Sequence, residues 1–175
     1  NTFLGQVNGW MLICLGEFLL AFLKGKEVRA GFWLIGLLVK PQTLILLLPG
    51  LLLGRRWKAL AGFAAAGAAV ALISVVLAGG YGLGDLALLI LHYVQGLPTN
   101  APEAMMNWRA VAFNLSDLLP QHVAWAVSMG GLILTAGIAL SLWVRPSLLP
   151  DKLPLILFGT YAATCAATWH SHVHM

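Results

Sequence analysis

A lysine and a proline interrupt the middle of a long apolar run. Residues 31–53 read GFWLIGLLVKPQTLILLLPGLLL, in which Lys40 is the only charged residue. Hydrocarbon tolerates an ionisable side chain only where it is paired or in contact with water, so such a residue is by default a functional hypothesis. Pro41 breaks a helix and disfavours helical geometry in the residue before it. The run therefore predicts a site at Lys40-Pro41-Gln42, where irregular backbone faces protein or a water-filled cavity.

The composition indicates an integral membrane protein. Hydrophobic residues make up 60% of the chain, charged residues make up 9%, and the mean hydropathy is +0.88. Soluble domains contain about 25% charged residues. The pI of about 9.4 does not indicate nucleic-acid binding, because the cations flank apolar segments instead of forming a patch. Cys14 and Cys165 both lie inside apolar segments, so neither a disulfide nor a cysteine metal site is expected.

The other apolar segments predict an all-α, polytopic helical bundle. They are residues 10–23, 59–78, 123–144 and 153–169. The second is uninterrupted over about 20 residues, which is the length that crosses a bilayer. We therefore treat residues 1–175 as a single transmembrane domain. Because the chain starts at Asn1 without a methionine, we expect it to be a fragment of a longer membrane protein.

The basic residues suggest a topology. Two clusters flank the run 31–53, and they consist of Lys24, Lys26, Arg29 and of Arg55, Arg56, Lys58. If the run enters the membrane and returns at Lys40-Pro41, both clusters lie on the inner face, as the positive-inside rule favours. The arms of such a hairpin would reach only about 14 and 20 Å at 1.5 Å per residue. A single tilted span therefore remains the alternative.

Residues 79–122 are predicted to form an outer loop with short interfacial helices. Residues 83–94 are apolar, with polar residues near one face, which suits a helix lying on the membrane surface. Asn100 and Glu103 resemble a capping box that would start a second short helix, carrying Asn107-Trp108-Arg109. Trp108 would either stack on a sugar or anchor the loop in the membrane interface.

Under the hairpin topology, the polar side chains gather on the outer face. They are Gln6, Asn8, Lys40, Gln42, Asn107, Arg109, His170, His172 and His174. The cations of Lys40 and Arg109 suit a lipid-linked phosphate, and the amides suit sugar hydroxyls because each can donate and accept. Two structural alternatives stay open: an ion pair of Lys40 with Glu17, and an interfacial, snorkelling Arg109.

The terminal histidine string could suggest zinc. Alternating positions point together only on an extended segment, and no carboxylate or cysteine is near in the sequence. We therefore predict no metal site. A histidine that acts as a base or hydrogen-bond donor near neutral pH is favoured, and a polar helix end without catalysis is the alternative.

Several of these motifs resemble glycosyltransferase family 87. They are Gly5-Gln6-Val7-Asn8, residues 36–42 (GLLVKPQ) with Pro49 after them, residues 55–60 (RRWKAL), Asn107-Trp108-Arg109 and His172-Val173-His174. The resemblance spans essentially the whole chain. At its end, His170-Ser171-His172 stands where the family usually has Ser-Pro-His. By this resemblance His172 is the best candidate for a functional histidine, followed by His174.

The resemblance implies a GT-C-like membrane enzyme, a hexosyl- or pentosyltransferase. Such an enzyme would transfer a sugar, mannose being the expected one, from a polyprenyl-phosphate donor. The acceptor would be a hydroxyl of a lipid or glycan on the outer face of the bacterial plasma membrane, and no further cofactor is predicted. In GT-C enzymes an acidic residue of the first outer loop typically acts as general base, and nothing here matches that loop. We therefore expect N- and C-terminal parts to be missing, the base with them, and this fragment to be inactive alone.

Two other classes of function remain open. A transporter or flippase of a lipid-linked or anionic substrate would also use broken helices with a charged hinge. It would need polar residues reachable from both faces, and the inner half offers only Glu17. A non-catalytic membrane subunit is the third option.

Overall fold

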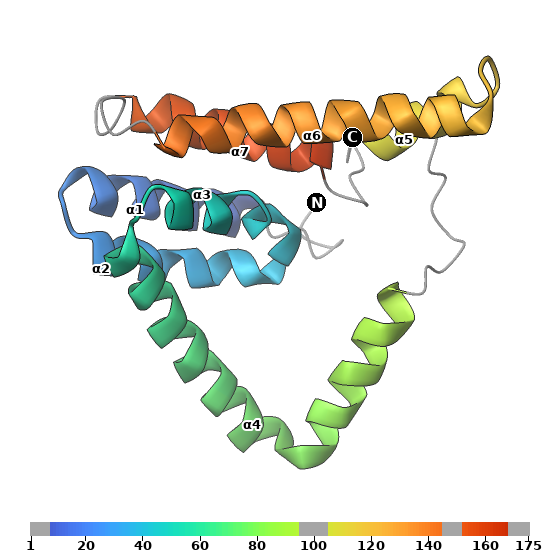
Figure 1. The fold of residues 1–175 in the computed structure, drawn as a ribbon. Helices are drawn as coiled ribbons and strands as arrows, with labels where there is room; N and C mark the ends of the chain where they lie inside the picture. The colour runs from blue at the N-terminus through green and yellow to red at the C-terminus, as the bar shows by residue number, and fades with distance from the viewer. Residues whose placement is uncertain (1–7, 95–104, 145–151, 168–175) are drawn as a thin grey trace.

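The computed structural model describes residues 8–94, 105–144 and 152–167, and every regular element in these ranges is a helix (Figure 1). The predicted all-α fold is confirmed. The elements are α1 (Asn8–Leu23), α2 (Glu27–Trp33), the 3₁₀ helices η2 (Leu34–Val39) and η3 (Pro41–Leu44), α3 (Leu47–Leu53), α4 (Trp57–Val94), α5 (Trp108–Leu115), α6 (Gln121–Val144) and α7 (Leu153–Ala167).

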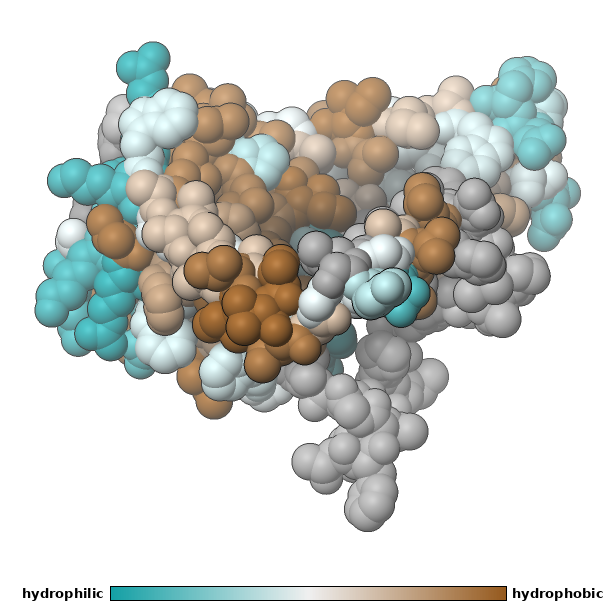
Figure 2. Space-filling view, turned by 90° about the horizontal axis from the view of Figure 1, so that it is seen from below, coloured by the Kyte–Doolittle hydropathy of each residue, from teal (hydrophilic) through white to brown (hydrophobic). Residues whose placement is uncertain are grey.

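Among the described residues, two segments are long and apolar enough to cross a membrane. They are Trp57–Gly79 of α4 and Gln121–Val144 of α6, and only 11% and 17% of their most apolar windows are buried. The core helix of a soluble protein would hide these side chains, whereas a membrane helix exposes them to lipid. Figure 2 shows apolar side chains across the middle of one face and hydrophilic ones toward its two ends. The protein is a helical membrane protein.

The chain reverses at Lys40. Its φ of −132° and ψ of 78° are not helical, and its carbonyl oxygen accepts hydrogen bonds from Thr43 N at 3.0 Å and Thr43 Oγ1 at 2.8 Å. Glu27, which starts α2, forms an ion pair of 3.0 Å with Arg56, which follows α3. The residues that flank the segment 31–53 therefore meet, as the predicted hairpin requires, whereas a single tilted span would hold them apart.

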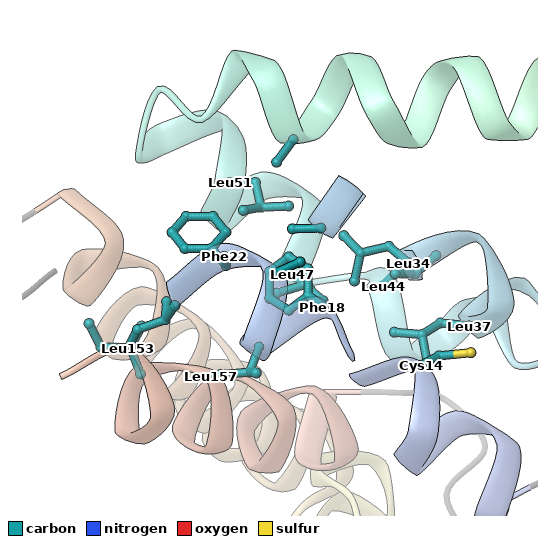
Figure 3. Packing of buried hydrophobic residues seen from close by; sticks show 14 of the residues in the cluster. Cys14, Phe18, Phe22, Leu34, Leu37, Leu44, Leu47, Leu51, Leu153 and Leu157 are labelled. Atoms are coloured by element: carbon teal, nitrogen blue, oxygen red, sulfur yellow. The ribbon is translucent and has the colours of Figure 1, made fainter. Parts of the chain in front are cut away.

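The hairpin packs into an apolar core made by helices far apart in the sequence. Figure 3 shows Cys14 and Phe18 of α1, Leu37 of η2, Leu51 of α3 and Leu157 of α7 within this cluster. Each of these side chains is buried. Helix η2 packs on α1, while η3 and α3 pack on α7, so the two arms of the reversal are held by different helices.

Helices α2 and α4 touch through their backbones. A Cβ on Gly31 would collide with the carbonyl of Ala59, and one on Gly62 would collide with the carbonyl of Val28. Small residues at these positions allow the close approach that holds helices together in lipid.

Helix α4 changes direction at Gly79, where φ is 66° and ψ is −175°. The helix predicted for residues 83–94 is present, but as a second arm of α4. Figure 1 shows this arm turning back toward the side of the molecule on which α5 lies. Residues 95–104 lie outside the described ranges, and the second predicted helix begins at Trp108, after the expected start near Asn100.

Candidate functional site

Lys40 and Asn8 form the centre of the candidate site. Lys40 Nζ donates a hydrogen bond of 2.9 Å to Asn8 Oδ1, although the two residues are 32 positions apart. Asn8 is exposed at the start of α1, and Lys40 is partly exposed at the reversal. Two residues predicted independently to bind substrate therefore lie in direct contact.

The alternative pairing of Lys40 with Glu17 is wrong. Glu17 Oε2 accepts a hydrogen bond from Arg29 Nη2 at 3.3 Å. This pair lies between α1 and α2, away from Asn8. Lys40 is consequently neutralised by no carboxylate among the described residues, and its amide partner leaves its positive charge intact.

Gln42 lies beside this pair in sequence, on η3, and its side chain is exposed. The next residue, Thr43, is buried and binds back to the carbonyl of Lys40. This contact fixes the backbone between the two polar side chains. Thr43 was not predicted, although a hydroxyl residue three positions after a helix break is a usual signal for a local turn bond.

An apolar groove of about 440 Å³ runs between α1 and α7 and has Asn8 at one end. Between Asn8 and Leu19 the groove follows α1 for about 16 Å at 1.5 Å per residue. Most of its lining residues are apolar: Met11, Leu12, Leu15, Leu19, Leu37, Pro154, Leu157 and Phe158. The other three are Asn8, Gly16 and Tyr161. Lys40 does not line the groove, but its Nζ contacts Asn8, which does. A cation beside the end of an apolar groove is complementary to a molecule with an acidic head and a hydrocarbon tail. The spacing of Leu12, Leu15 and Leu19 along one helix face was the signal for it in the sequence.

Trp108 anchors α5 to α6. Its Nε1 donates to Thr135 Oγ1 at 3.1 Å, and its carbonyl accepts a hydrogen bond from Ser128 Oγ. Its ring lies where a Cβ on Gly131 would have to be. Trp108 therefore anchors α5 on α6 through these contacts, and its stacking on a sugar stays a prediction.

Asn107 caps α5. Its Oδ1 accepts the N–H of Ala110 at 2.9 Å, its Nδ2 lies 3.6 Å from Met105 Sδ, and it is buried. A side-chain oxygen at this position satisfies an otherwise unpaired helical N–H. The helix that carries Trp108 and Arg109 is therefore capped by Asn107, and Asn100 lies outside the described residues.

Arg109 is held on the same helix. Its guanidinium carbon lies 5.4 Å from the centre of the Phe113 ring, which meets Trp125 edge to face at 5.9 Å. Helix α5 packs on α6, whereas Lys40 lies against α1. The two predicted cations are thus positioned by separate parts of the fold.

Gln6, His170, His172 and His174 lie outside the described residues, so their roles stay predictions. Within the described ranges, no group of three His, Cys, Asp or Glu side chains could hold a metal ion. That finding does not test the prediction that the terminal histidine string binds no metal, because the string lies outside those ranges.

The family model described as "Glycosyltransferase family 87" matches residues 1–169 of this chain. No curated protein and no solved structure matches the chain.

Proposed function

This chain belongs to glycosyltransferase family 87, and from that premise we propose that it transfers a sugar from a polyprenyl phosphate. It is a membrane glycosyltransferase. The proposal adds the donor, mannose as the sugar, a lipid or glycan hydroxyl as the acceptor, and the outer face of the bacterial plasma membrane as the place of reaction. Family membership favours this function over the transporter and subunit alternatives.

The observation that carries the proposal is the position of the Lys40–Asn8 pair at one end of the groove between α1 and α7. A polyprenyl chain would lie in the groove, and its phosphate would reach Lys40 Nζ. A hydrogen bond from an ammonium group to a phosphate is charge-assisted and therefore among the strong ones. Asn8 would orient the ammonium group without neutralising it.

The transfer places negative charge on the leaving phosphate. The acceptor oxygen attacks the anomeric carbon, the bond from that carbon to the phosphate oxygen breaks, and a base takes the hydroxyl proton. Lys40 would stabilise the developing charge, with Arg109 as the second candidate, because cations aimed at developing charge lower the barrier. His172 is the proposed functional histidine, followed by His174.

The exposed amides around Lys40 would recognise the sugar. Gln42 lies two residues from Lys40 on the reversal, and Asn8 retains its Nδ2 donor beside the lysine. Gln6 precedes Asn8 in sequence and extends the set. Amides suit sugar hydroxyls, since one group both donates and accepts. For Asn107 we propose instead a positioning role, because its amide caps α5.

The test is Lys40→Met in the complete gene product, assayed in membranes with a radiolabelled polyprenyl-phosphate sugar. We expect kcat/KM to fall about 10- to 100-fold, since a hydrogen bond to a charged group contributes about 1.5–3 kcal/mol. Lys40→Arg should keep part of the activity, because the positive charge is retained.

Lys26→Met is the matched control. Lys26 is an exposed cation between α1 and α2, at the end of α1 away from Asn8. It should leave kcat/KM unchanged. Equal transfer by Lys40→Met and the native enzyme would disprove the role of Lys40 in binding phosphate.

A further inference from the structure

A second cavity lies at the opposite end of α1 from Lys40. Lys40 contacts Asn8, the first residue of α1. At the other end of α1, the guanidinium carbon of Arg56 lies 5.2 Å from the centre of the Phe22 ring, one residue before the end of the helix. The cavity measures about 590 Å³, and its lining includes Arg55, Arg56, Trp57 and Trp143. It is therefore a basic and aromatic cavity in the region of the inner basic clusters, and the proposed transfer does not use it.

Arg55 occupies a backbone conformation that glycine normally fills. Helices α1 and α3 end in the same hydrogen-bonded turn: Gly25 N binds Phe22 O and Lys26 N binds Ala21 O, both at 2.9 Å, after α1. After α3, Arg55 N binds Leu52 O at 3.0 Å and Arg56 N binds Leu51 O at 2.9 Å.

The φ angle is 69° at Gly25 and 54° at Arg55. Glycine is the usual residue at this position of the turn, because an L side chain is disfavoured there. The chain thus follows the usual pattern after α1 and departs from it after α3. The departure places an exposed guanidinium in the wall of the cavity.

Part of the guanidinium group of Arg56 already has a partner. Its Nη1 pairs with Glu27 at 3.0 Å, while its Nε is buried and has no hydrogen-bond partner in the part of the chain that the structure describes. Helix α4 begins one residue later, at Trp57, so the positive end of its dipole lies beside Arg55, although the N–H groups of Ala59 and Leu60 already bond to the carbonyl of Arg56. Both features favour an anion near Arg55.

The remaining lining is apolar and exposed. Leu52, Leu53 and Val144 are each about half exposed, at 49%, 47% and 55%. Trp57 is 61% exposed at the start of the membrane-spanning arm of α4, which is where an interfacial tryptophan is expected. Free phosphate would use only the cations, whereas a phospholipid would use the cations and the apolar wall.

We propose that this cavity binds the headgroup of an anionic glycerophospholipid of the inner leaflet. The phosphodiester contacts Arg55 and the first turn of α4, and the acyl chains lie along Leu52, Leu53 and Val144. Basic pockets between membrane helices on the cytoplasmic side suit such headgroups. The site is independent of the proposed transfer.

The test uses the complete chain, purified in detergent, with phosphatidylglycerol binding followed by native mass spectrometry. Arg55→Gly should weaken binding about fivefold, as expected for the loss of one cation near a phosphate. The same variant should melt at a higher temperature without lipid, since glycine fits the positive φ at this turn. A purely structural arginine would give no loss of binding.

Lys24→Gln is the matched control, because Lys24 is an exposed cation after α1 that does not line the cavity. It should bind phosphatidylglycerol as the native chain does. Phosphatidylcholine and inorganic phosphate serve as the other ligands and should bind much more weakly. Undiminished binding by Arg55→Gly, an equal loss in Lys24→Gln, or equal binding of either comparison ligand would overturn the proposal.

Discussion

The side chain of Asn107 holds the first turn of α5 together. The acceptor is its Oδ1, the donor is the N–H of Ala110, and the distance is 2.9 Å. Two asparagines near this helix, Asn100 and Asn107, are both chemically able to cap it. Sequence spacing favoured Asn100 as the cap and left Asn107 for substrate. In the structure the helix starts at Trp108, whose ring packs on α6 and whose N-terminal neighbour Asn107 supplies the cap.

Replacing Asn107 with alanine should destabilise the first turn of α5 by about 1 kcal/mol, because an N–H of the turn loses its acceptor. Hydrogen exchange of the Ala110 amide should accelerate about fivefold. Asn107→Ser should exchange more slowly than the alanine variant, since serine is also a good cap. Equal acceleration in both variants would contradict the capping role.

The same pair of variants separates capping from sugar recognition. If the amide of Asn107 contacted the sugar, the serine variant would keep the exchange protection of α5 and lose transfer activity as fully as the alanine variant. We expect instead that activity follows the protection of α5.

Lys40 and Asn8 show what a sequence reveals about a site. A charge inside an apolar run and an amide at the start of a span are conspicuous, so each residue could be selected alone. Their hydrogen bond joins residues 32 positions apart. It depends on how η2 and η3 pack against α1, and no local pattern encodes that packing. The ion pair of Glu17 with Arg29 was missed for the same reason.

At the scale of elements, apolar runs predicted helices better than their ends and junctions. The segments α1, α6, α7 and the first arm of α4 follow directly from hydrophobic stretches with charged or polar flanks. The two 3₁₀ helices on either side of Lys40, Leu34–Val39 and Pro41–Leu44, were not predicted, because proline indicates a break but not the type of helix beside it. The continuation of α4 beyond Gly79 was also missed, since residues 79–122 were assigned to an outer loop with a separate surface helix.

The contact between α2 and α4 gives an element-scale prediction. Gly62→Ala should separate the two helices, because its Cβ would meet the backbone of Val28. We expect the melting temperature in detergent to fall, because overpacking typically lowers the free energy of unfolding by about 1–3 kcal/mol.

Gly67→Ala is the control on the same helix. Its Cβ would lie 3.5 Å from Ile35 Cδ1, which is an ordinary contact. Alanine also favours a helix over glycine by up to about 1 kcal/mol, so the melting temperature should stay equal or rise. A fall in both variants would show that the close approach at Gly62 is not the cause.

The charged residues distinguish the two ends of the molecule. Glu27 and Arg56 join the two basic clusters at one end, and Lys40 lies with Asn8 at the other end of α1. If the basic end is cytoplasmic, Lys40 faces outward, where the transfer is proposed. The fold gives the relative positions of these residues, and the orientation in a membrane follows from the positive-inside rule.

Cysteine labelling in membrane vesicles tests this arrangement. In a chain with Cys14→Ala and Cys165→Ala, three exposed positions are changed one at a time: Lys26→Cys, Lys58→Cys and Gln42→Cys. A membrane-impermeant maleimide should label the first two only from the inner side, because the Glu27–Arg56 pair holds their loops together. Labelling of Lys26→Cys and Lys58→Cys from opposite sides would mean that residues 31–53 cross the membrane once. Gln42→Cys, at the reversal, should react from the outer side, and reaction only from the inner side would place the Lys40 site away from the outer-face transfer proposed here.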